Sequence, residues 1–202
     1  MEFETFAPLD RLGFVTHAFT LRTAEDTKAD DFQQRVVQSL GYSEFASAGQ
    51  PHGNAVAVVS APSSTDNVDA LATSTPNLPL VVRCADCAAV FIVDQITTAI
   101  ALIHSGKKGT EGHVTTNVLT AMQRAFGTQP QNCLAFIGPS IGPCHYEMDL
   151  WSGIEQELRD FGVHEIYNPH FCTACHLDRY FSYRAEKGRT GRMLAVLALK
   201  PS

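Results

Sequence analysis

The segment that decides the fold lies in the middle of the chain and reads, from Leu78 to His104, LPLVVRCADCAAVFIVDQITTAIALIH. It contains three short apolar runs, Leu78–Val82, Ala88–Val93 and Ala99–His104, which are rich in Val and Ile. Runs of this length and composition predict strands that are buried on both faces. We therefore expect these three strands to form the centre of the protein.

Amphipathic helices are expected on both sides of this segment. Apolar side chains recur at helical spacing in residues 30–40, 112–126 and 151–161, and a glycine follows each stretch where a helix typically ends. Two further strands are predicted at Leu134–Ile137 and Met193–Leu199. Strands and helices mix without strict alternation, which indicates an α+β (mixed α/β) fold.

The remaining organisation is simple. Residues 60–79 are rich in Ser, Thr, Pro, Ala and Asn, a composition that predicts a surface loop. No repeat and no linker interrupts the 202 residues, and a chain of this length falls in the usual range of one domain. We therefore treat residues 1–202 as a single domain.

Composition excludes several classes of protein. The chain is 45% apolar and 18% charged, with 15 basic and 21 acidic residues and a net charge of −6. An acidic chain without a basic cluster is poorly suited to nucleic acid or anionic lipid. Its apolar runs are far shorter than the ~20 residues of a membrane span, and Met1–Glu4 carries acid where an export signal has basic residues. We expect a cytoplasmic protein with reduced cysteines.

Two C-x-x-C pairs, Cys84–Cys87 and Cys172–Cys175, supply the number of thiols that a four-cysteine zinc site needs. The 84 residues between Cys87 and Cys172 argue against that pairing. The second pair continues into His176, the C-x-x-C-H pattern of haem attachment, but that chemistry belongs to exported proteins. We interpret Cys172 and Cys175 as ordinary thiols near the surface.

A different set combines His52, Cys87 and His104, each at a point where an apolar run meets a loop. Two imidazoles and one thiolate, with a fourth position left open, match a catalytic zinc site. Each residue alone has a simpler interpretation, since buried cysteines are common and a single histidine often satisfies a local hydrogen bond.

Several motifs resemble those of one family, and they occur in its order. They are Gln50-Pro-His52-Gly53 (Q-x-H-G), Asp69-Ala-Leu-Ala-Thr73 (D-A-L-x-T), Ala85-Asp86-Cys87 (A-D-C), His104-Ser-Gly106 with Gly109-Thr110 (H-A-G-W-R-G-T), Ile137-Gly-Pro-Ser-Ile-Gly142 with Tyr146-Glu147, Cys172-Thr173, Ser182-Tyr-Arg184 and Thr190-Gly-Arg192. Together they resemble the laccase-domain family, also called peptidoglycan editing factor or multicopper polyphenol oxidase and understood as zinc-dependent purine nucleoside phosphorylases.

The resemblance implies a four-layer α/β/β/α domain in which His52, Cys87 and His104 hold one Zn²⁺ and carry the catalysis. The implied partners are a purine nucleoside and phosphate. The implied reaction is phosphorolysis of adenosine, inosine or methylthioadenosine, accompanied by adenosine deamination. A metal cation in an open site suits both reactions, because it stabilises an anion and activates water.

The chain departs from the family at three places. Lys107-Lys108 stands where the family has Trp-Arg. This difference removes an aromatic stacking surface and a planar guanidinium group that can bind phosphate through two hydrogen bonds. Ala89 replaces a proline. The segment between Arg22 and Gln50 is short and lacks the family's Gly-Gly-Val-Ser and Asn-Leu elements, so we expect part of a substrate wall to be altered.

Three cations are candidate substrate-binding residues for phosphate: Arg22, which resembles the family's T-R element, Lys108 and Arg184. Each also has an ordinary interpretation as a solvated or fold-stabilising charge. The other histidines that we considered show no metal-like partner in the sequence and are expected to be surface or structural residues: His17, His113, His145, His164 and His170.

Three other functions compete with the zinc phosphorylase. Cys87 and His104 could form the nucleophile and base of a metal-independent cysteine hydrolase. A degenerate relative would bind a nucleoside without turning it over. A multicopper oxidase is disfavoured, because its copper clusters use roughly ten histidines and this chain has 8.

Overall fold

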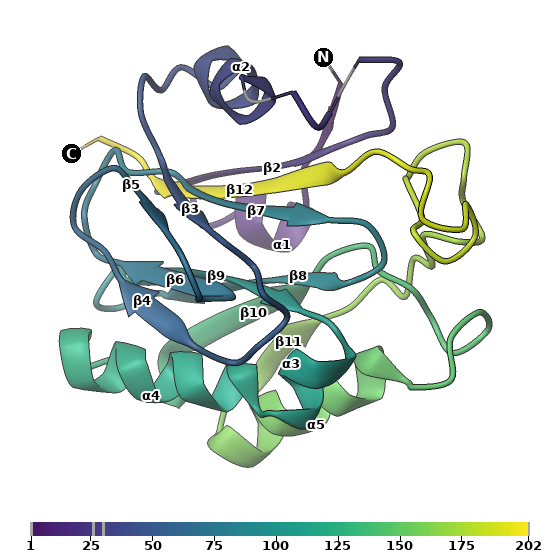
Figure 1. Ribbon diagram of the computed structural model, residues 1–202. Coiled ribbons are helices and arrows are strands. Elements are labelled where there is room, and N and C mark those ends of the chain that lie inside the picture. The colour runs from purple at the N-terminus through teal and green to yellow at the C-terminus, as the bar shows by residue number, and fades with distance from the viewer. Residues whose placement is uncertain (1, 26, 30, 202) are drawn as a thin grey trace.

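Two mixed six-stranded sheets form the centre of the molecule (Figure 1). The computed structural model describes residues 2–25, 27–29 and 31–201. The upper sheet has the spatial order β1-β2-β12-β7-β3-β5. Its strands are β1 Phe3–Glu4, β2 Val15–Thr20, β3 Ala46–Ala48, β5 Ser63–Thr65, β7 Leu80–Cys84 and β12 Met193–Leu199.

The lower sheet has the spatial order β11-β10-β8-β9-β6-β4, and its central strands β10, β8, β9 and β6 pair antiparallel. Its strands are β4 Val56–Val58, β6 Ala70–Thr73, β8 Ala88–Asp94, β9 Ile100–Ser105, β10 Cys133–Ile137 and β11 Glu165–Tyr167. The connection between β7 and β8 is therefore a crossing from one sheet to the other, and it carries Cys87.

Helices cover the outer faces of both sheets, so the layers run α/β/β/α as the family resemblance implied (Figure 1). The α-helices are α1 Ala7–Asp10, α2 Phe32–Ser39, α3 Lys107–Glu111, α4 Val114–Phe126 and α5 Leu150–Phe161, and Pro130–Asn132 forms a short 3₁₀ turn. α2 packs on the upper sheet, and α4 and α5 pack on the lower one. No helix within the described residues is long and apolar enough to cross a membrane.

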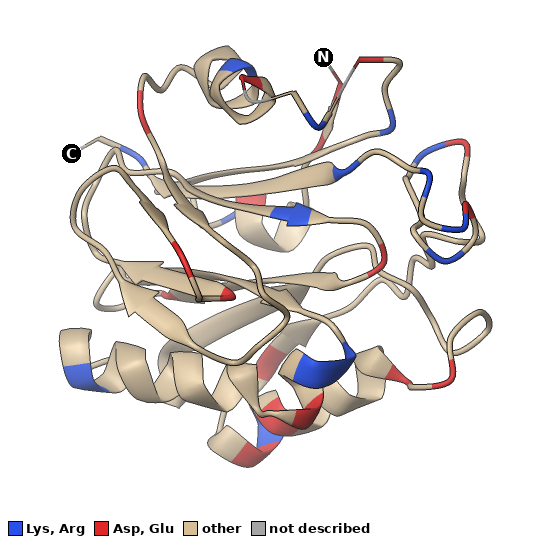
Figure 2. Ribbon diagram, in the orientation of Figure 1, with Lys and Arg blue, Asp and Glu red and all other residues tan. Residues whose placement is uncertain are grey.

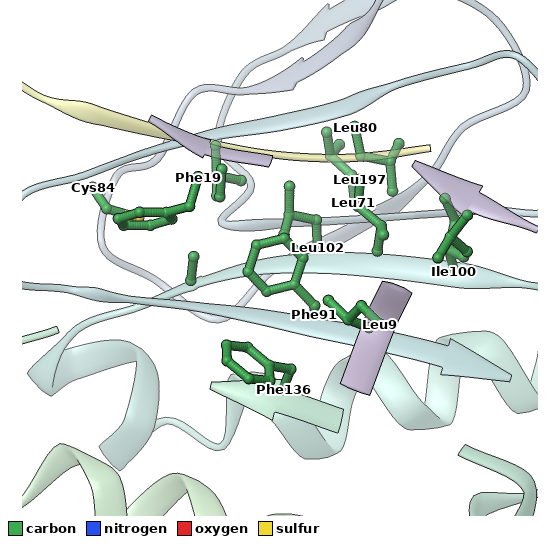
Figure 3. Packing of buried hydrophobic residues seen from close by; sticks show 14 of the residues in the cluster. Leu9, Phe19, Leu71, Leu80, Cys84, Phe91, Ile100, Leu102, Phe136 and Leu197 are labelled. Carbon is green, nitrogen blue, oxygen red and sulfur yellow. The ribbon is translucent and has the colours of Figure 1, made fainter. Parts of the chain in front are cut away.

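The central strands are buried on both faces, which explains their continuous apolar sequence. On β8, Phe91 and Val93 point into the core between the sheets, whereas Val90 and Ile92 pack against the helices below. Figure 3 shows Phe91 within the inter-sheet core, with Leu102 of β9 beside it. Full burial of each such side chain contributes about 1.5–3 kcal/mol through removal from water.

The predicted central strands, the three helices and the strands near residues 134 and 193 are all present within a residue or two. Met1 and Asp30, where the expected N-terminal pattern and the first helix begin, lie outside the described residues. The prediction of a loop over residues 60–79 is wrong, because β5 and β6 lie within it. β6 is a fully buried Ala-Leu-Ala-Thr strand. Its small side chains do not distinguish it from the loop-like residues around it.

Candidate metal centre and its cavity

Three predicted side chains meet at one edge of the sheet sandwich. His52 lies in the loop after β3, Cys87 ends the crossing from β7 to β8, and His104 lies near the end of β9. Their ligand atoms all lie within 4.8 Å of one another. We call this group the open cluster, because His52 is exposed while His104 is only 4% exposed.

Asp69, which immediately precedes β6, orients both histidines. Its Oδ1 lies 2.9 Å from Nδ1 of His104 and accepts a hydrogen bond from the backbone N–H of His52 at 3.0 Å. Its Oδ2 accepts from the N–H of Gly53 at 2.6 Å. A carboxylate on Nδ1 fixes the tautomer of a histidine and leaves Nε2 for a metal. Burial lowers the pKa of His104, against the opposing effect of Asp69, which favours the neutral ligand form.

The loop that carries His52 has an unusual backbone that is held in place from two sides. Gln50 and His52 both have φ of 65°, a left-handed conformation that is costly for residues other than glycine. The Gln50 N–H donates to the carbonyl of Val68, and the Gln50 side chain bonds the backbone of Arg83 on β7 in both directions. These bonds to β7 and the segment before β6 stabilise the conformation that presents His52.

Cys87 is packed too closely for any side chain at position 106. A Cβ added to Gly106 would lie 2.6 Å from the Cys87 Sγ, which explains the glycine of the His-Ser-Gly motif. Burial raises the pKa of the Cys87 thiol to about 12, and the charges of Asp86 and Asp69 add to the effect. An uncharged buried thiol is a poor nucleophile, whereas a bound cation reverses this balance and holds the thiolate.

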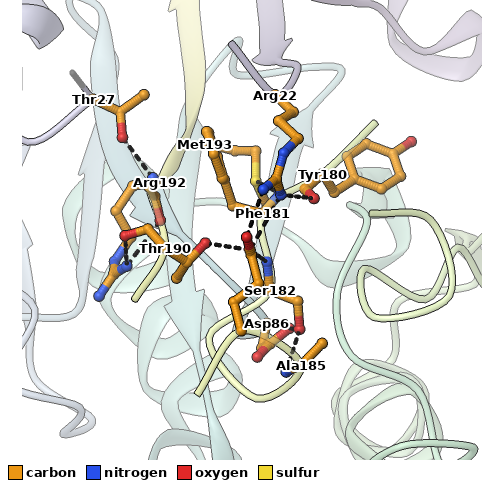
Figure 4. A network of polar contacts seen from close by, with 12 residues as sticks. Arg22, Thr27, Asp86, Tyr180, Phe181, Ser182, Ala185, Thr190, Arg192 and Met193 are labelled. Atoms are coloured by element: carbon orange, nitrogen blue, oxygen red, sulfur yellow. Dashed lines mark hydrogen bonds and ion pairs between the residues drawn. The ribbon is translucent and has the colours of Figure 1, made fainter. Parts of the chain in front are cut away.

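Asp86 connects three of the sequence motifs at one buried carboxylate. Its Oδ1 accepts hydrogen bonds from the hydroxyls of Thr173 and Ser182, each at 2.7 Å, and its Oδ2 accepts from the Arg184 N–H at 2.6 Å. Figure 4 shows Asp86 below Ser182 in the network around the C-terminal loops. Because Asp86 adjoins Cys87, these bonds fix the loops of residues 172–186 relative to the open cluster.

Sequence reasoning placed Asp69 and Asp86 inside recognised motifs but gave neither a role. Both act across large separations in the chain, Asp69 on His104 and Asp86 on Ser182. The A-D-C and D-A-L-x-T motifs were the available signal, since an acid next to an apolar strand is unusual unless it has a partner.

A cavity of about 1440 Å³ includes all three residues of the open cluster in its lining. Seven of the chain's 15 Lys and Arg residues also line it: Lys28, Arg83, Lys107, Lys108, Arg184, Lys187 and Arg192. Among the residues that the structure describes, the acidic members of the lining are Asp66 and Asp86. Figure 2 shows blue segments on α3, on β7 and at the start of β12. A protein of net charge −6 thus gathers positive charge at this one cavity, and such clefts attract anions.

The three cations predicted to bind phosphate have different positions. Lys108 and Arg184 line the cavity with the open cluster. Arg22 lines a smaller hollow beside it, where its guanidinium bonds both carboxylate oxygens of Glu186, at 2.5 and 3.1 Å. The structure therefore places Lys108 and Arg184 in the lining of this cavity and Arg22 outside it. Arg22 is paired with Glu186, and Arg184 is paired with Glu147.

The departures from the family pattern also have a structural context. Lys107 begins α3, lines the cavity and lies 3.7 Å from a carboxylate oxygen of Glu147. The short segment before Gln50 still contributes Thr27, Ala29 and Gln33 to the cavity lining. Tyr146 and Tyr183 line the same cavity and offer aromatic faces although a lysine occupies the position of the family's tryptophan.

A second group of ligating side chains lies outside the predicted site. It consists of Cys144, His145, Cys172 and Cys175, whose ligand atoms all lie within 4.8 Å of one another. The expectation that His145 has no metal-like partner is therefore wrong, because its Nδ1 lies 3.3 Å from the Cys144 Sγ. No sequence pattern indicated this group, since Cys144 belongs to no C-x-x-C pair and 27 residues lie between it and Cys172.

Neither C-x-x-C interpretation from the sequence matches this arrangement. Cys84 is fully buried on β7 in the inter-sheet core and belongs to neither cluster, so the two C-x-x-C pairs do not share a site. His176 packs edge-on against Phe171 instead of joining Cys172 and Cys175. Burial raises the pKa of Cys172, but the N–H groups of Gly142, Cys175 and Ala174 and the Cys144 thiol outweigh it and lower the value to about 7.

Curated relatives share the sequence pattern. A protein of Deinococcus radiodurans named purine nucleoside phosphorylase is 28% identical over 230 aligned positions, covering 92% of this chain and 89% of that protein. One of Bacteroides thetaiotaomicron with the same name is 30% identical over 164 positions, covering 65% of this chain and 61% of its own length. The chain thus spans less than two thirds of the Bacteroides protein.

Solved structures share the fold. YlmD from Geobacillus stearothermophilus superposes with a TM-score of 0.88 at 21% identity, covering 94% of this chain and 93% of that one. The Bacillus licheniformis protein YfiH gives 0.87 at 23% identity over 92% of this chain and 93% of its own. The model of the family described as multi-copper polyphenol oxidoreductase laccase matches residues 21–149 and 145–200. With nearly the whole chain matched by that model, this protein belongs to that laccase-like family.

Proposed function

We propose that this protein is a zinc-dependent purine nucleoside phosphorylase that acts on adenosine, inosine or methylthioadenosine, with adenosine deamination as a side activity. The observation that carries the proposal is that an open cluster of two histidines and one cysteine shares a single cavity with seven Lys and Arg side chains. Relatives that bear the name purine nucleoside phosphorylase support the same choice.

The donor set fits zinc. His104 offers Nε2 because Asp69 occupies its Nδ1, His52 is held by its backbone on the same carboxylate, and the Cys87 sulfur completes three ligands. Three protein ligands that leave a fourth position accessible from a cavity are typical of catalytic rather than structural zinc. When bound, the metal supplies Lewis-acid charge at the reacting centre.

We assign phosphate binding to cations in the lining of the cavity. Lys108 makes no ion pair with a described residue, so its ammonium group is available in the cavity. Arg184 is held by Glu147, with a 2.7 Å hydrogen bond, and its guanidinium lies 4.7 Å from the centre of the Tyr146 ring. In phosphorolysis, these groups would orient the attacking anion and reduce repulsion as it approaches the ribose.

The purine base requires a flat apolar surface and hydrogen-bonding groups near it. Tyr146 and Tyr183 provide aromatic rings in the cavity, each with an arginine over one face, and Gln33 provides an amide group. We assign the base to the tyrosine side of the cavity. In this assignment, the tyrosine rings take the place of the stacking surface that the family's Trp would provide. Lys107, which stands at the position of that Trp, has no aromatic ring.

The test is to incubate zinc-loaded protein with inosine and measure hypoxanthine and ribose 1-phosphate with and without phosphate. We expect both products only when phosphate is present, and their loss in His104→Ala. With adenosine, we expect adenine together with a smaller amount of inosine. An unchanged nucleoside would overturn the proposal, and a bound but unconverted nucleoside would identify a non-catalytic relative.

Two further outcomes identify the competing enzymes. A metal-free protein that remains active and loses activity when Cys87 is alkylated would indicate the cysteine hydrolase, in which His104 acts as the base. A copper-loaded protein that oxidises phenols and shows an intense visible absorption band would indicate an oxidase. The donor set of one thiol and two imidazoles favours neither over zinc.

A further inference from the structure

We infer that Cys144, His145, Cys172 and Cys175 form a second, structural zinc site with three thiolates and one imidazole. We call this group the closed cluster. It is separate from the open cluster and does not depend on the proposed function. None of its members is among the residues that line the cavity.

The distances between the ligand atoms match a zinc tetrahedron. With Zn–S of about 2.3 Å and Zn–N of about 2.0–2.1 Å, two sulfurs lie about 3.8 Å apart and a sulfur and a nitrogen about 3.6 Å apart. The Sγ atoms of Cys144 and Cys175 are 3.6 Å apart. Nδ1 of His145 lies 3.3, 3.5 and 3.8 Å from the sulfurs of Cys144, Cys175 and Cys172.

The backbone around Cys172 also suits a thiolate ligand. The Gly142 N–H donates to the Cys172 Sγ at 3.3 Å. The Cys175 N–H also bonds the Cys172 carbonyl at 3.1 Å, which closes the C-x-x-C turn. N–H donors around a sulfur stabilise its negative charge, as the second shell of a metal site does.

The position of the closed cluster gives the metal a structural purpose. It joins residues 138–149 to residues 168–192, two long segments that contain neither helix nor strand. Such segments lack the repeated backbone hydrogen bonds of a helix or strand, and a metal held by both adds its binding free energy to the stability of their folded arrangement. The first segment carries Tyr146 and the second carries Tyr183 and Arg184, so the cross-link would fix one wall of the cavity.

Metal analysis tests the site directly. Protein purified under reducing conditions from zinc-supplemented cells is freed of loosely bound metal, and zinc per chain is measured. We expect about two zinc ions in the wild type, about one in His104→Ala and about one in Cys144→Ser/Cys175→Ser. Cys133→Ala, a buried cysteine on β10 outside both clusters, is the matched control and should retain both ions.

Cobalt substitution provides a second readout that does not require the cysteine variants to fold. The closed cluster would supply three thiolates and the open cluster one, so His104→Ala loaded with cobalt should keep most of the thiolate-to-metal absorption. Loss of the entire band in His104→Ala would overturn the inference. One zinc per wild-type chain that is lost in His104→Ala and kept in Cys144→Ser/Cys175→Ser would also overturn it.

Discussion

The open and closed clusters use the same kinds of side chain for different purposes. The open cluster combines two imidazoles with one thiol at the ends of strands and faces a large cationic cavity. The closed cluster combines three thiols with one imidazole on two irregular loops and faces no part of that cavity. The number of ligands and the support behind them distinguish a site for chemistry from a site for stability.

The two clusters also differ in the groups that hold their ligands in position. Behind the open cluster stands the fully buried Asp69, which fixes a histidine tautomer and two backbone N–H groups. In the closed cluster, the backbone N–H of Gly142 bonds the Cys172 sulfur. A site that must keep one coordination position free needs its ligands held by the fold, whereas four ligands fix their own geometry around a metal.

The largest difference between the clusters should follow from Asp69→Asn. The amide offers one acceptor where three donors converge, so the His104 ring and the His52 loop lose their orientation. We expect zinc affinity at the open cluster to fall about 10–100-fold and phosphorolysis to fall with it. Competition with a zinc chelator would measure this, and the more tightly held closed-cluster zinc should be unchanged. Equal loss from both clusters would contradict the separation.

Two glycine substitutions address one cluster each. Gly106→Ala places a Cβ 2.6 Å from the Cys87 sulfur and should displace that ligand. Gly142→Ala drives a Cβ into the Trp151 ring and shifts the N–H that bonds Cys172. Zinc content should fall by about one ion in each variant, from opposite clusters. Cobalt spectra would assign the loss, and the same spectrum from both variants would refute the account.

Asp86 links the regions that carry the two clusters, so its loss should affect both moderately. Asp86→Ala leaves two buried hydroxyls and one backbone N–H without an acceptor. We expect the unfolding free energy to fall by about 2–4 kcal/mol. Position 86 has a left-handed backbone, with φ of 84°, so Asp86→Asn should lose less, because asparagine retains one acceptor and tolerates this conformation. Urea denaturation at a fixed zinc concentration measures this change in the free energy of unfolding. A decrease of less than about 0.5 kcal/mol for Asp86→Ala would be inconsistent with the hydrogen-bond network.

The smallest expected effects separate the candidate phosphate cations. Lys108→Gln should raise KM for phosphate about tenfold, because it removes a positive charge from the lining of the cavity that holds the open cluster. Arg22→Gln breaks the ion pair with Glu186 outside the cavity and should change KM for phosphate less than about twofold. Initial rates measured at varied phosphate concentration give the two KM values. A larger increase in KM for Arg22→Gln than for Lys108→Gln would indicate Arg22 as the phosphate contact.

The sequence predicted those parts of the fold in which local pattern and tertiary environment agree. The apolar strands around Phe91 and Leu102 could be identified because strands buried on both faces need continuous apolar residues. β6 could not, since Ala and Thr are compatible with a loop until a neighbouring sheet buries them. α3 was missed for a similar reason, because Lys107-Lys108-Gly109 carries no helical apolar pattern.

For the site, sequence motifs located the residues of the open cluster but not the groups that hold them. His52, Cys87 and His104 meet as expected, while the role of Asp69 depends on a pairing between β6 and β9 that no local pattern reveals. The closed cluster depends on two loops meeting across the surface, so Cys144 and Cys172 become neighbours only in the folded chain.

The most direct test of the division between the clusters is the rate of inosine phosphorolysis in zinc-loaded variants that lack one cluster each. We predict that His104→Ala loses activity about 10²-fold or more, and that Cys144→Ser/Cys175→Ser keeps kcat within about threefold at room temperature while unfolding at a lower temperature. Full activity in His104→Ala, or its complete loss in a folded double cysteine variant, would contradict the assignment of catalysis to the open cluster.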